Sequence, residues 1–251
     1  MKGYIDMHCH ILPGVDDGAE DIAEMEAMLR LAYQEGIRCI IATPHYHPRR
    51  GKEEPETLIK RTNLLRDTAH AIDENFRIYL GTEIYFGQDV IQKLKEKRIL
   101  TMNQRNYVLI EFGAAEPFSY IRQSLQQIQF SGYEVILAHA ERYGCIVENP
   151  GFAAQLWEMG IHLQINAGSI CGDGGRKIKK FVRRLMEEDL VFCVGTDAHD
   201  IKYRPPRMKK AAEYVQKKHG EEYARRIFFS NAKEMLKKGE RYAKQERESG
   251  N

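Results

Sequence analysis

The amino-acid sequence predicts an α/β protein, a TIM-like parallel barrel of about seven strand–helix units. Two features of the sequence support this prediction. Short runs rich in Val, Ile, Leu and Tyr alternate with helical patterns at intervals of roughly thirty residues, as in βα repeats. The runs also lack a regular polar alternation, which is typical of parallel strands that are covered on both faces.

Each predicted element has a local cause in the sequence. The apolar runs predict strands over residues 4–8, 38–43, 78–83, 106–112, 134–138, 162–166 and 191–196. The first helix is expected to begin after the acidic pair Glu20-Asp21 and to stop at Gly36, and its apolar residues fall at helical spacing: Ile22, Met25, Met28, Leu29 and Ala32. Similar patterns predict helices over 88–97, 120–130, 151–159, 177–188 and 207 to about 242, and 48–55 is expected to be a rim loop.

Length and charge limit the classes of protein to which the chain can belong. Its 251 residues are enough to bury a full core, and no linker divides the pattern, so residues 1–251 are expected to form a single domain. The 38 basic and 36 acidic residues leave a net charge of only +2, which argues against a nucleic-acid partner. No signal sequence and no membrane-spanning run is evident, so a cytoplasmic location without membrane insertion is expected.

Histidines and carboxylates follow the ends of the predicted strands. They are His8, His10, His45, Glu83, Glu111, His139, Asp197 and His199, with Asp16-Asp17 soon after the first strand. Because the carboxyl ends of barrel strands meet at one face, these side chains are expected to form one multinuclear metal site of a hydrolase. Imidazole and carboxylate mixtures accept Mn, Fe or Zn, and the lack of a Cys-x-x-Cys pair among the five cysteines argues against a structural zinc site.

The ordered series of motifs resembles the polymerase and histidinol phosphatase (PHP) superfamily, and more closely the manganese-dependent protein tyrosine phosphatases of bacterial capsule and exopolysaccharide loci. The resemblance covers nearly the whole chain. It rests on Asp6-Met-His-Cys-His10, Val15-Asp-Asp-Gly18, Thr43-Pro-His45, Gly81-Thr-Glu83, Ile110-Glu111, His139-Ala-Glu-Arg142-Tyr143, Gln164-Ile-Asn-Ala-Gly168 and Gly195-Thr-Asp-Ala-His199. It implies the PHP fold, a distorted (βα)7 barrel, in a cytoplasmic phosphatase.

The resemblance also implies three divalent metal ions, with Mn favoured over Fe or Zn. One ion would be held by His8, His10, Glu83 and Asp197, and a second by Glu83, Glu111 and His139. The third would be held by Asp17, His45 and His199, with Asp16 as the alternative to Asp17. Four carboxylates would leave a charge of about +2 on three divalent ions, which matches a phosphate monoester of about −1.5 to −2.

The expected reaction is in-line attack on phosphorus by a metal-activated hydroxide. Arg142 and Arg204 match positions where relatives hold the phosphate, and a guanidinium fork suits its oxygens. Phenolate is a good leaving group because the pKa of phenol is near 10. His47 is a candidate for a general acid or a substrate contact.

Three functions are compatible with such a site. The resemblance favours a protein tyrosine phosphatase that acts on the autophosphorylated C-terminal tail of a polysaccharide-synthesis tyrosine kinase. A small-molecule phosphatase, such as histidinol phosphatase, would share the metals but would need a pocket for one small ligand. A regulatory metal-binding module would dock on the kinase without turnover.

Overall fold

All the β-strands of the computed structural model pair in parallel, and they form two sheets. The structure describes residues 3–47, 49, 51 and 53–237. The smaller sheet has the order β1 (Tyr4–Cys9), β2 (Ile37–Ala42), β4 (Arg77–Leu80). The larger has the order β3 (His45–Tyr46), β5 (Glu83–Tyr85), β6 (Tyr107–Glu111), β7 (Glu134–Leu137), β8 (His162–Asn166), β9 (Val191–Gly195). The predicted α/β class with parallel strands is confirmed.

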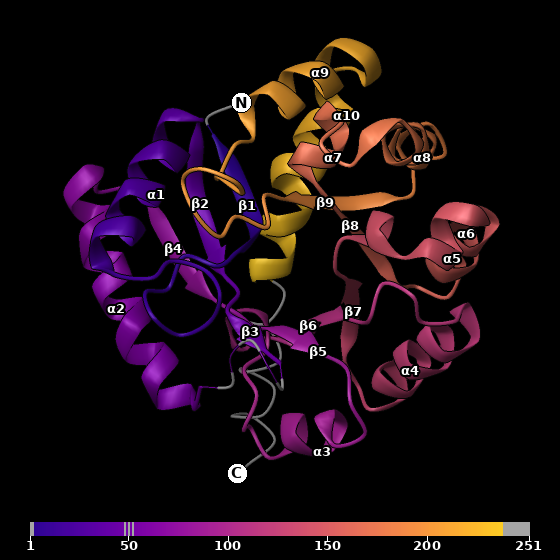
Figure 1. The fold of residues 1–251 in the computed structure, drawn as a ribbon, viewed down its shortest axis with the longest axis horizontal. Coiled ribbons are helices and arrows are strands. Elements are labelled where there is room, and N and C mark those ends of the chain that lie inside the picture. The colour runs from indigo at the N-terminus through magenta and orange to yellow at the C-terminus, as the bar shows by residue number, and fades with distance from the viewer. Residues whose placement is uncertain (1–2, 48, 50, 52, 238–251) are drawn as a thin grey trace.

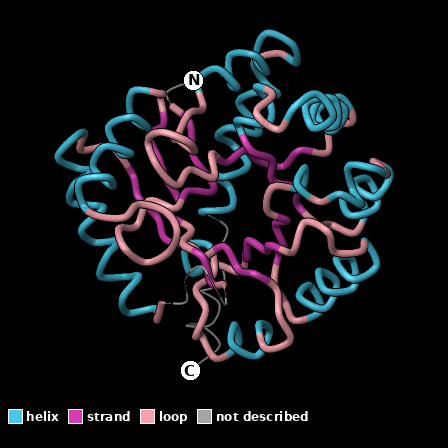
Figure 2. The backbone as a smooth tube through the Cα atoms, viewed as in Figure 1, coloured by secondary structure: helices cyan, strands magenta, loops and turns pink. Residues whose placement is uncertain are grey.

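Helices separate most of the strands in sequence and lie outside them in space (Figures 1 and 2). They are α1 (Ile22–Gln34), α2 (Pro55–Ile72), α3 (Val90–Lys95), α4 (Phe118–Phe130), α5 (Gly144–Glu148), α6 (Gly151–Glu158), α7 (Ala167–Cys171), α8 (Gly175–Glu187), α9 (Lys209–His219) and α10 (Glu221–Arg225). No helix in the described part of the chain combines the length and the apolar character that crossing a membrane requires.

Strands β1 and β9 approach each other, although they belong to different sheets. Near the ends of β1 and β9, Cys9 and Ala198 form an isolated parallel bridge. The Asp197 N–H donates to the His8 carbonyl at 2.7 Å, and the His10 N–H donates to the Ala198 carbonyl at 2.8 Å. These contacts bring the first and last strands together at their carboxyl ends.

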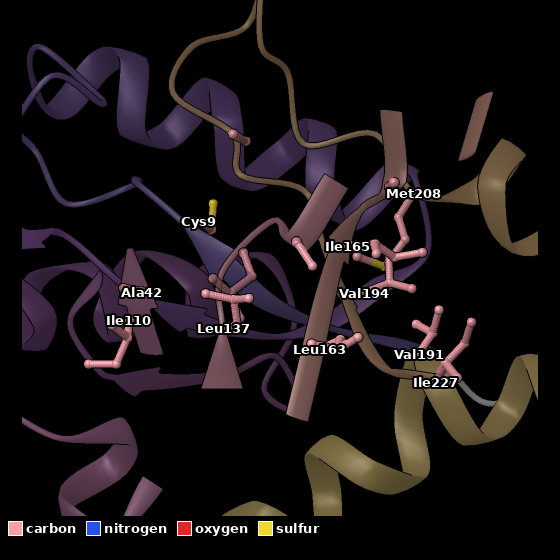
Figure 3. Packing of buried hydrophobic residues seen from close by; sticks show 14 of the residues in the cluster. Cys9, Ala42, Ile110, Leu137, Leu163, Ile165, Val191, Val194, Met208 and Ile227 are labelled. Carbon is pink, nitrogen blue, oxygen red and sulfur yellow. The ribbon is translucent and has the colours of Figure 1, made fainter. Parts of the chain in front are cut away.

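The core is built from strands that are buried on both faces. Every residue of β6 is buried, and β1 is buried from Ile5 onward. The larger of two apolar clusters joins the strands of both sheets to the surrounding helices. Figure 3 shows members of it, including Ile110, Leu137 and Leu163. Each fully buried Leu or Ile contributes roughly 1.5–3 kcal/mol. This packing holds the carboxyl ends of the strands in place.

The structure corrects three predicted elements. The predicted strand 78–83 is two strands in different sheets, because the chain crosses between the sheets at Gly81, which packs closely on Met102. The expected loop 48–55 leads into α2, a helix that was not predicted and that starts with Pro55. The predicted helix from 207 is interrupted by Gly220, with φ +91°, and continues as α10 and a π-helical turn, Arg226–Ser230. Residues 238–242 of that prediction lie outside the described residues.

Candidate metal centre

The structure brings the nine predicted metal-site residues to one place, at the carboxyl ends of the strands. His8 lies near the end of β1, and His10 directly follows that strand. His45, Glu83 and Glu111 belong to β3, β5 and β6. His139 follows β7, Asp197 and His199 follow β9, and Asp17 lies in the loop before α1. All of them are buried except Asp17, whose side chain is 45% exposed.

Glu83 occupies the middle of the cluster. Its Oε2 atom lies 3.3 Å from His8 Nε2, 3.2 Å from His10 Nε2 and 3.0 Å from His45 Nδ1. Its Oε1 atom lies 2.8 Å from His139 Nε2. Burial raises the pKa of this carboxyl, but the surrounding imidazoles, His8 first, outweigh burial and hold the pKa well below its usual range. Glu83 is therefore an ionised carboxylate placed to bridge two positions.

The rings of His8 and His10 fit a cation between them. His8 Nδ1 donates to Gln164 Oε1 at 3.1 Å, and His10 Nδ1 donates to Asp16 Oδ2 at 2.8 Å. With a proton on each Nδ1, the two Nε2 atoms present lone pairs to each other at a separation of 3.0 Å. Two such lone pairs, next to the carboxylates of Glu83 and Asp197, require a positive charge, as a metal ion supplies.

The electrostatics of His8 lead to the same conclusion. Burial lowers the pKa of this imidazole, but Glu83 and Asp197 outweigh burial and raise the pKa to about 9. The buried site thus attracts positive charge strongly, and a divalent ion can replace the proton. His199 behaves in the opposite way, because burial and the neighbouring His10 lower its pKa to about 4. Its neutral ring is suited to metal ligation at neutral pH.

A second group of donor atoms forms around Asp17. Asp17 Oδ1 lies 3.2 Å from His45 Nε2 and 3.4 Å from His199 Nε2. His10 also offers a donor atom here, and the four candidate atoms lie within 4.8 Å of one another. Asp16 points elsewhere: its Oδ2 accepts from His10 Nδ1 and from the His45 N–H, and its Oδ1 accepts from the Gly18 N–H. The geometry supports Asp17 rather than Asp16 as the ligand.

The remaining donors lie between these groups. His45, Glu83 and Glu111 offer three atoms within 4.8 Å of one another, and His139 Nε2 lies 3.7 Å from Glu111 Oε1. The other group is the one described first, around His8, His10 and Asp197. The predicted grouping did not anticipate that His10 and His45 each lie between two groups. The described residues thus offer three adjacent positions with shared ligands.

Two residues of the cluster have a left-handed backbone. His139 has φ +32° and Asp197 has φ +53°, a region that residues other than glycine rarely adopt. In both cases the chain turns sharply where a strand has just ended. The turn directs each side chain inward, toward the other ligands.

Arg142 and Arg204 meet on Asp197. Arg142 Nη2 lies 2.5 Å from Asp197 Oδ2, and Arg204 Nη2 lies 2.7 Å from Asp197 Oδ1. Both guanidinium groups line a pocket of about 590 Å³ that borders the metal-ligand cluster at Asp197. They are partly exposed, with 42% and 37% of the side chain accessible, so both can reach a ligand in this pocket.

His47 lies farther from this pocket. Its ring centroid is 5.9 Å from that of His45 and 4.4 Å from that of Tyr85, in an edge-on contact. Its Nδ1 accepts the Arg49 N–H at 3.0 Å. His47 is not among the residues that line the 590 Å³ pocket. It lies next to the His45 side of the metal-ligand cluster.

The sequence analysis assigned no role to Gln164, which organises the site. Its Oε1 accepts the His139 N–H at 2.8 Å as well as His8 Nδ1, and its Nε2 donates to Asn166 Oδ1. Asn166 in turn donates to Asp197 Oδ2 at 2.9 Å. The sequence clue to this role was the polar Gln164 within a predicted buried strand. It is completely buried in β8, where its amide needs hydrogen-bond partners.

Comparison with known proteins identifies the family. Residues 4–237 match the family described as capsular polysaccharide synthesis, CpsB/CapC. The tyrosine-protein phosphatase YwqE of Bacillus subtilis is 38% identical over 218 residues, covering 87% of this chain and 86% of that protein. The tyrosine-protein phosphatase CpsB of Streptococcus pneumoniae is 34% identical over 239 residues, covering 92% and 98%.

Solved structures agree with the sequence matches. A crystal structure from the work on YwqE of B. subtilis and CpsB of S. pneumoniae, described as metal-dependent tyrosine phosphatases, aligns with a TM-score of 0.86 at 36% identity. It covers 93% of this chain and 94% of the other. The histidinol phosphate phosphatase of Lactococcus lactis, at 15% identity and a TM-score of 0.61, shares the fold and covers 91% and 97%. The resemblance inferred from the motifs is confirmed, and the chain belongs to the CpsB/CapC family of capsular polysaccharide synthesis proteins.

Proposed function

We propose that this chain is a metal-dependent protein tyrosine phosphatase. One observation carries the proposal most directly: a buried cluster of histidines and carboxylates shares Asp197 with a pocket lined by Arg142 and Arg204. Such a site combines ligands for divalent ions with donors for a phosphate. Relatives that cover most of the chain are named tyrosine-protein phosphatases.

We infer three divalent ions, with Mn as the preferred metal. The proposed ligands are His8, His10, Glu83 and Asp197 for the first ion, Glu83, Glu111 and His139 for the second, and Asp17, His45 and His199 for the third. Converging lone pairs and the bridging carboxylate of Glu83 support this assignment. Four carboxylates against three divalent ions leave about +2, which suits a dianionic phosphate ester.

Ions bound there would activate water and neutralise charge on the phosphate oxygens. Around them, Arg142 and Arg204 bind the outer phosphate oxygens through their guanidinium forks. Asp197 positions both arginines, and Asn166 holds Asp197 through its side-chain amide. His47, beside His45, is proposed to contact the leaving group or to protonate it.

The inferred substrate is a phosphotyrosine polypeptide, the C-terminal tail of a tyrosine kinase that controls capsular or exopolysaccharide synthesis. We assign residues 1–251 to one phosphatase domain with the PHP fold, a distorted (βα)7 barrel. The family match over residues 4–237 and the backbone contacts between β1 and β9 support that assignment. A cytoplasmic location, without membrane insertion or nucleic-acid binding, remains a prediction from the sequence.

Substrate comparison tests the function. The Mn-loaded protein should hydrolyse a phosphotyrosine peptide with a kcat/KM well above that for histidinol phosphate or a phosphoserine peptide. A preference for histidinol phosphate would favour a small-molecule phosphatase. Equal rates on all three would remove the tyrosine assignment. No turnover of any of them, with metal bound and the kinase tail captured, would favour a regulatory binding module.

A further inference from the structure

Helix α8 carries an unusual concentration of positive charge beside the 590 Å³ pocket that Arg142 and Arg204 line, which we call the phosphate pocket. Its thirteen residues include six cations and a single acid, Glu187, in a chain whose net charge is only +2. The cations are Arg176, Lys177, Lys179, Lys180, Arg183 and Arg184. The apolar side of the helix, including Phe181 and Leu185, is buried in the core, so the helix is not available for insertion into a membrane or a groove.

Three of these six cations have polar partners within the protein. Lys177 pairs with Glu148 at 3.5 Å, Arg184 with Glu188 at 2.6 Å, and Lys179 donates to the Cys171 carbonyl. Arg176, Lys180 and Arg183 form no ion pair with a carboxylate in the part of the chain that the structure describes. All three are exposed, and Arg183 lies over the Tyr214 ring at 5.6 Å. We call these three residues the α8 basic stripe.

Helix α8 begins at the edge of the phosphate pocket. Gly174 and Ile178, on either side of Arg176 in sequence, line that pocket, and α8 packs against the turn that carries Arg142. Figure 1 shows α8 outside β8 and β9, beside α7. A shallow surface hollow of about 480 Å³ runs along the helix and is lined by five of its cations and by Glu187. From Arg176 to Arg183 the helix rises about 10 Å, which an extended peptide covers in roughly three residues.

Further cations lie across the pocket. Lys202 and Arg207 line it from the loop after β9, and both are exposed. The acid groups among the lining residues are Glu141, Asp173 and Asp197, of which Glu141 and Asp197 are buried and bonded to Asn166. Apart from Asp173, the exposed charged side chains of the rim are therefore cations, and the stripe lies on the helix that begins at this rim.

We propose that the α8 basic stripe binds acidic residues of the substrate that lie a few positions from the phosphotyrosine, so that the enzyme selects phosphotyrosine in an acidic peptide context. The inference rests on the proposed phosphatase function and adds the substrate class. Charge complementarity and the short distance along α8 from the pocket edge to the stripe support an acidic peptide as the occupant. Because the stripe lies outside the metal site, it acts on binding and lowers KM while kcat stays the same.

Peptide kinetics test the proposal. Phosphotyrosine peptides of equal length, with Asp and Glu or with Ser and Gln on one flank or the other, are compared using the Mn-loaded full chain. We expect the peptide with acidic residues on one of the two flanks to have a KM about fivefold lower than that of the neutral peptide, and added salt should weaken this difference. The triple variant Arg176→Glu, Lys180→Glu, Arg183→Glu should abolish the preference and leave kcat for the neutral peptide unchanged. The matched control Lys217→Glu, Lys218→Glu, Arg225→Glu, on exposed cations that do not line the pocket, should keep it.

A binding measurement separates this inference from the proposed function. The same peptides with a phosphonate in place of the phosphate cannot be hydrolysed, and their affinities are read by fluorescence anisotropy. Tighter binding of an acidic peptide, lost in the α8 variant, would support the stripe even if no phosphotyrosine were hydrolysed. Equal binding would overturn it while leaving the phosphatase function intact, and so would a preference that survives in the α8 variant. Equal peptide binding with α8-dependent sedimentation on vesicles containing phosphatidylglycerol would assign the stripe to a membrane surface instead.

Discussion

Gly195 packs directly against His8: a Cβ atom at Gly195 would lie 2.6 Å from the His8 Cβ and 3.1 Å from Gln164 Nε2. Gly195→Ala should therefore displace His8 or β9 and disturb the donor atoms of the site. Because a shift of about 1 Å can cost roughly 100-fold in rate, we expect kcat/KM to fall by about that factor. Steady-state kinetics and metal content measure it. Gly87→Ala is the control, since the nearest atom to its added Cβ would be at 3.6 Å.

Glu83→Gln should reduce activity more than replacement of any one histidine. The change keeps the shape of the side chain but removes the charge that four imidazoles surround. We expect loss of more than one bound ion and a decrease in kcat/KM of at least about 100-fold. Elemental analysis and kinetics, alongside His199→Ala, provide the comparison. A fully metallated, active Glu83→Gln protein would contradict the bridging role.

Asp16 and Asp17 should respond differently to removal of charge. Asp17→Asn weakens the group around His45 and His199 and should lower the metal content. Asp16→Asn leaves that group in place but alters the partner of His10 Nδ1, so it should raise the Kd for the metal without removing a site. Titration calorimetry with Mn measures both variants. A full complement of metal in Asp17→Asn would reverse the assignment.

Arg142→Ala should weaken phosphate binding while the metals stay bound. Its guanidinium faces the pocket and Asp197 Oδ2, whereas Asp197 Oδ1, which lies nearer His8 and His10, contacts Arg204. We expect kcat/KM to fall about 100-fold and inhibition by inorganic phosphate to weaken. Arg142→Lys should recover only part of the loss, because an ammonium group cannot form the fork. Metal loss in the alanine variant would show that Arg142 supports the ligands instead.

Removal of metal should reverse the pH dependence of stability that His8 contributes. Despite burial, Glu83 and Asp197 raise its pKa from 6.5 to about 9 in the folded state. The stripped protein therefore has this stabilisation in full below pH 6.5 and loses it as the pH rises through about 9. Metal binding needs the neutral ring, so it strengthens over the same interval. The difference in Tm between loaded and stripped protein should widen from pH 6.5 to pH 9 in thermal scans at constant ionic strength, and a constant difference would refute this.

The sequence predicted β6, β7 and β8 best. The strand 162–166 was predicted with its exact bounds, and the runs before Glu111 and His139 gave β6 and β7 within two residues. Local patterns were enough there because these strands are buried on both faces. The run 78–83 failed because its apolar pattern continues through Gly81, where the chain changes sheets. That change depends on the distant residue Met102, which no local pattern includes.

Residue types and motifs predicted which side chains would gather, but not how they share neighbours. His10 and His45 lie between two groups because their rings enter the cluster from different strands. Gln164 went unassigned because its role depends on contacts with His8 and His139, which are far from it in sequence. Lys180 and Arg183 of the α8 basic stripe fell within the predicted helix 177–188 and Arg176 just before it, but the position of α8 beside the pocket depends on its packing on the turn with Arg142.

The hydrogen bonds between His8 and Asp197, and between His10 and Ala198, join residues that are synthesised far apart in time. A nascent chain has His8 and His10 outside the ribosome long before residues 197–199 are synthesised. Until then His8 and His10 lack these two backbone partners, and the cation position proposed for His8, His10, Glu83 and Asp197 lacks one of its carboxylates. A ribosome-bound fragment that stops after β8 should therefore be inert toward phosphate esters, and the catalyst should mature only after residues 197–199 have been added.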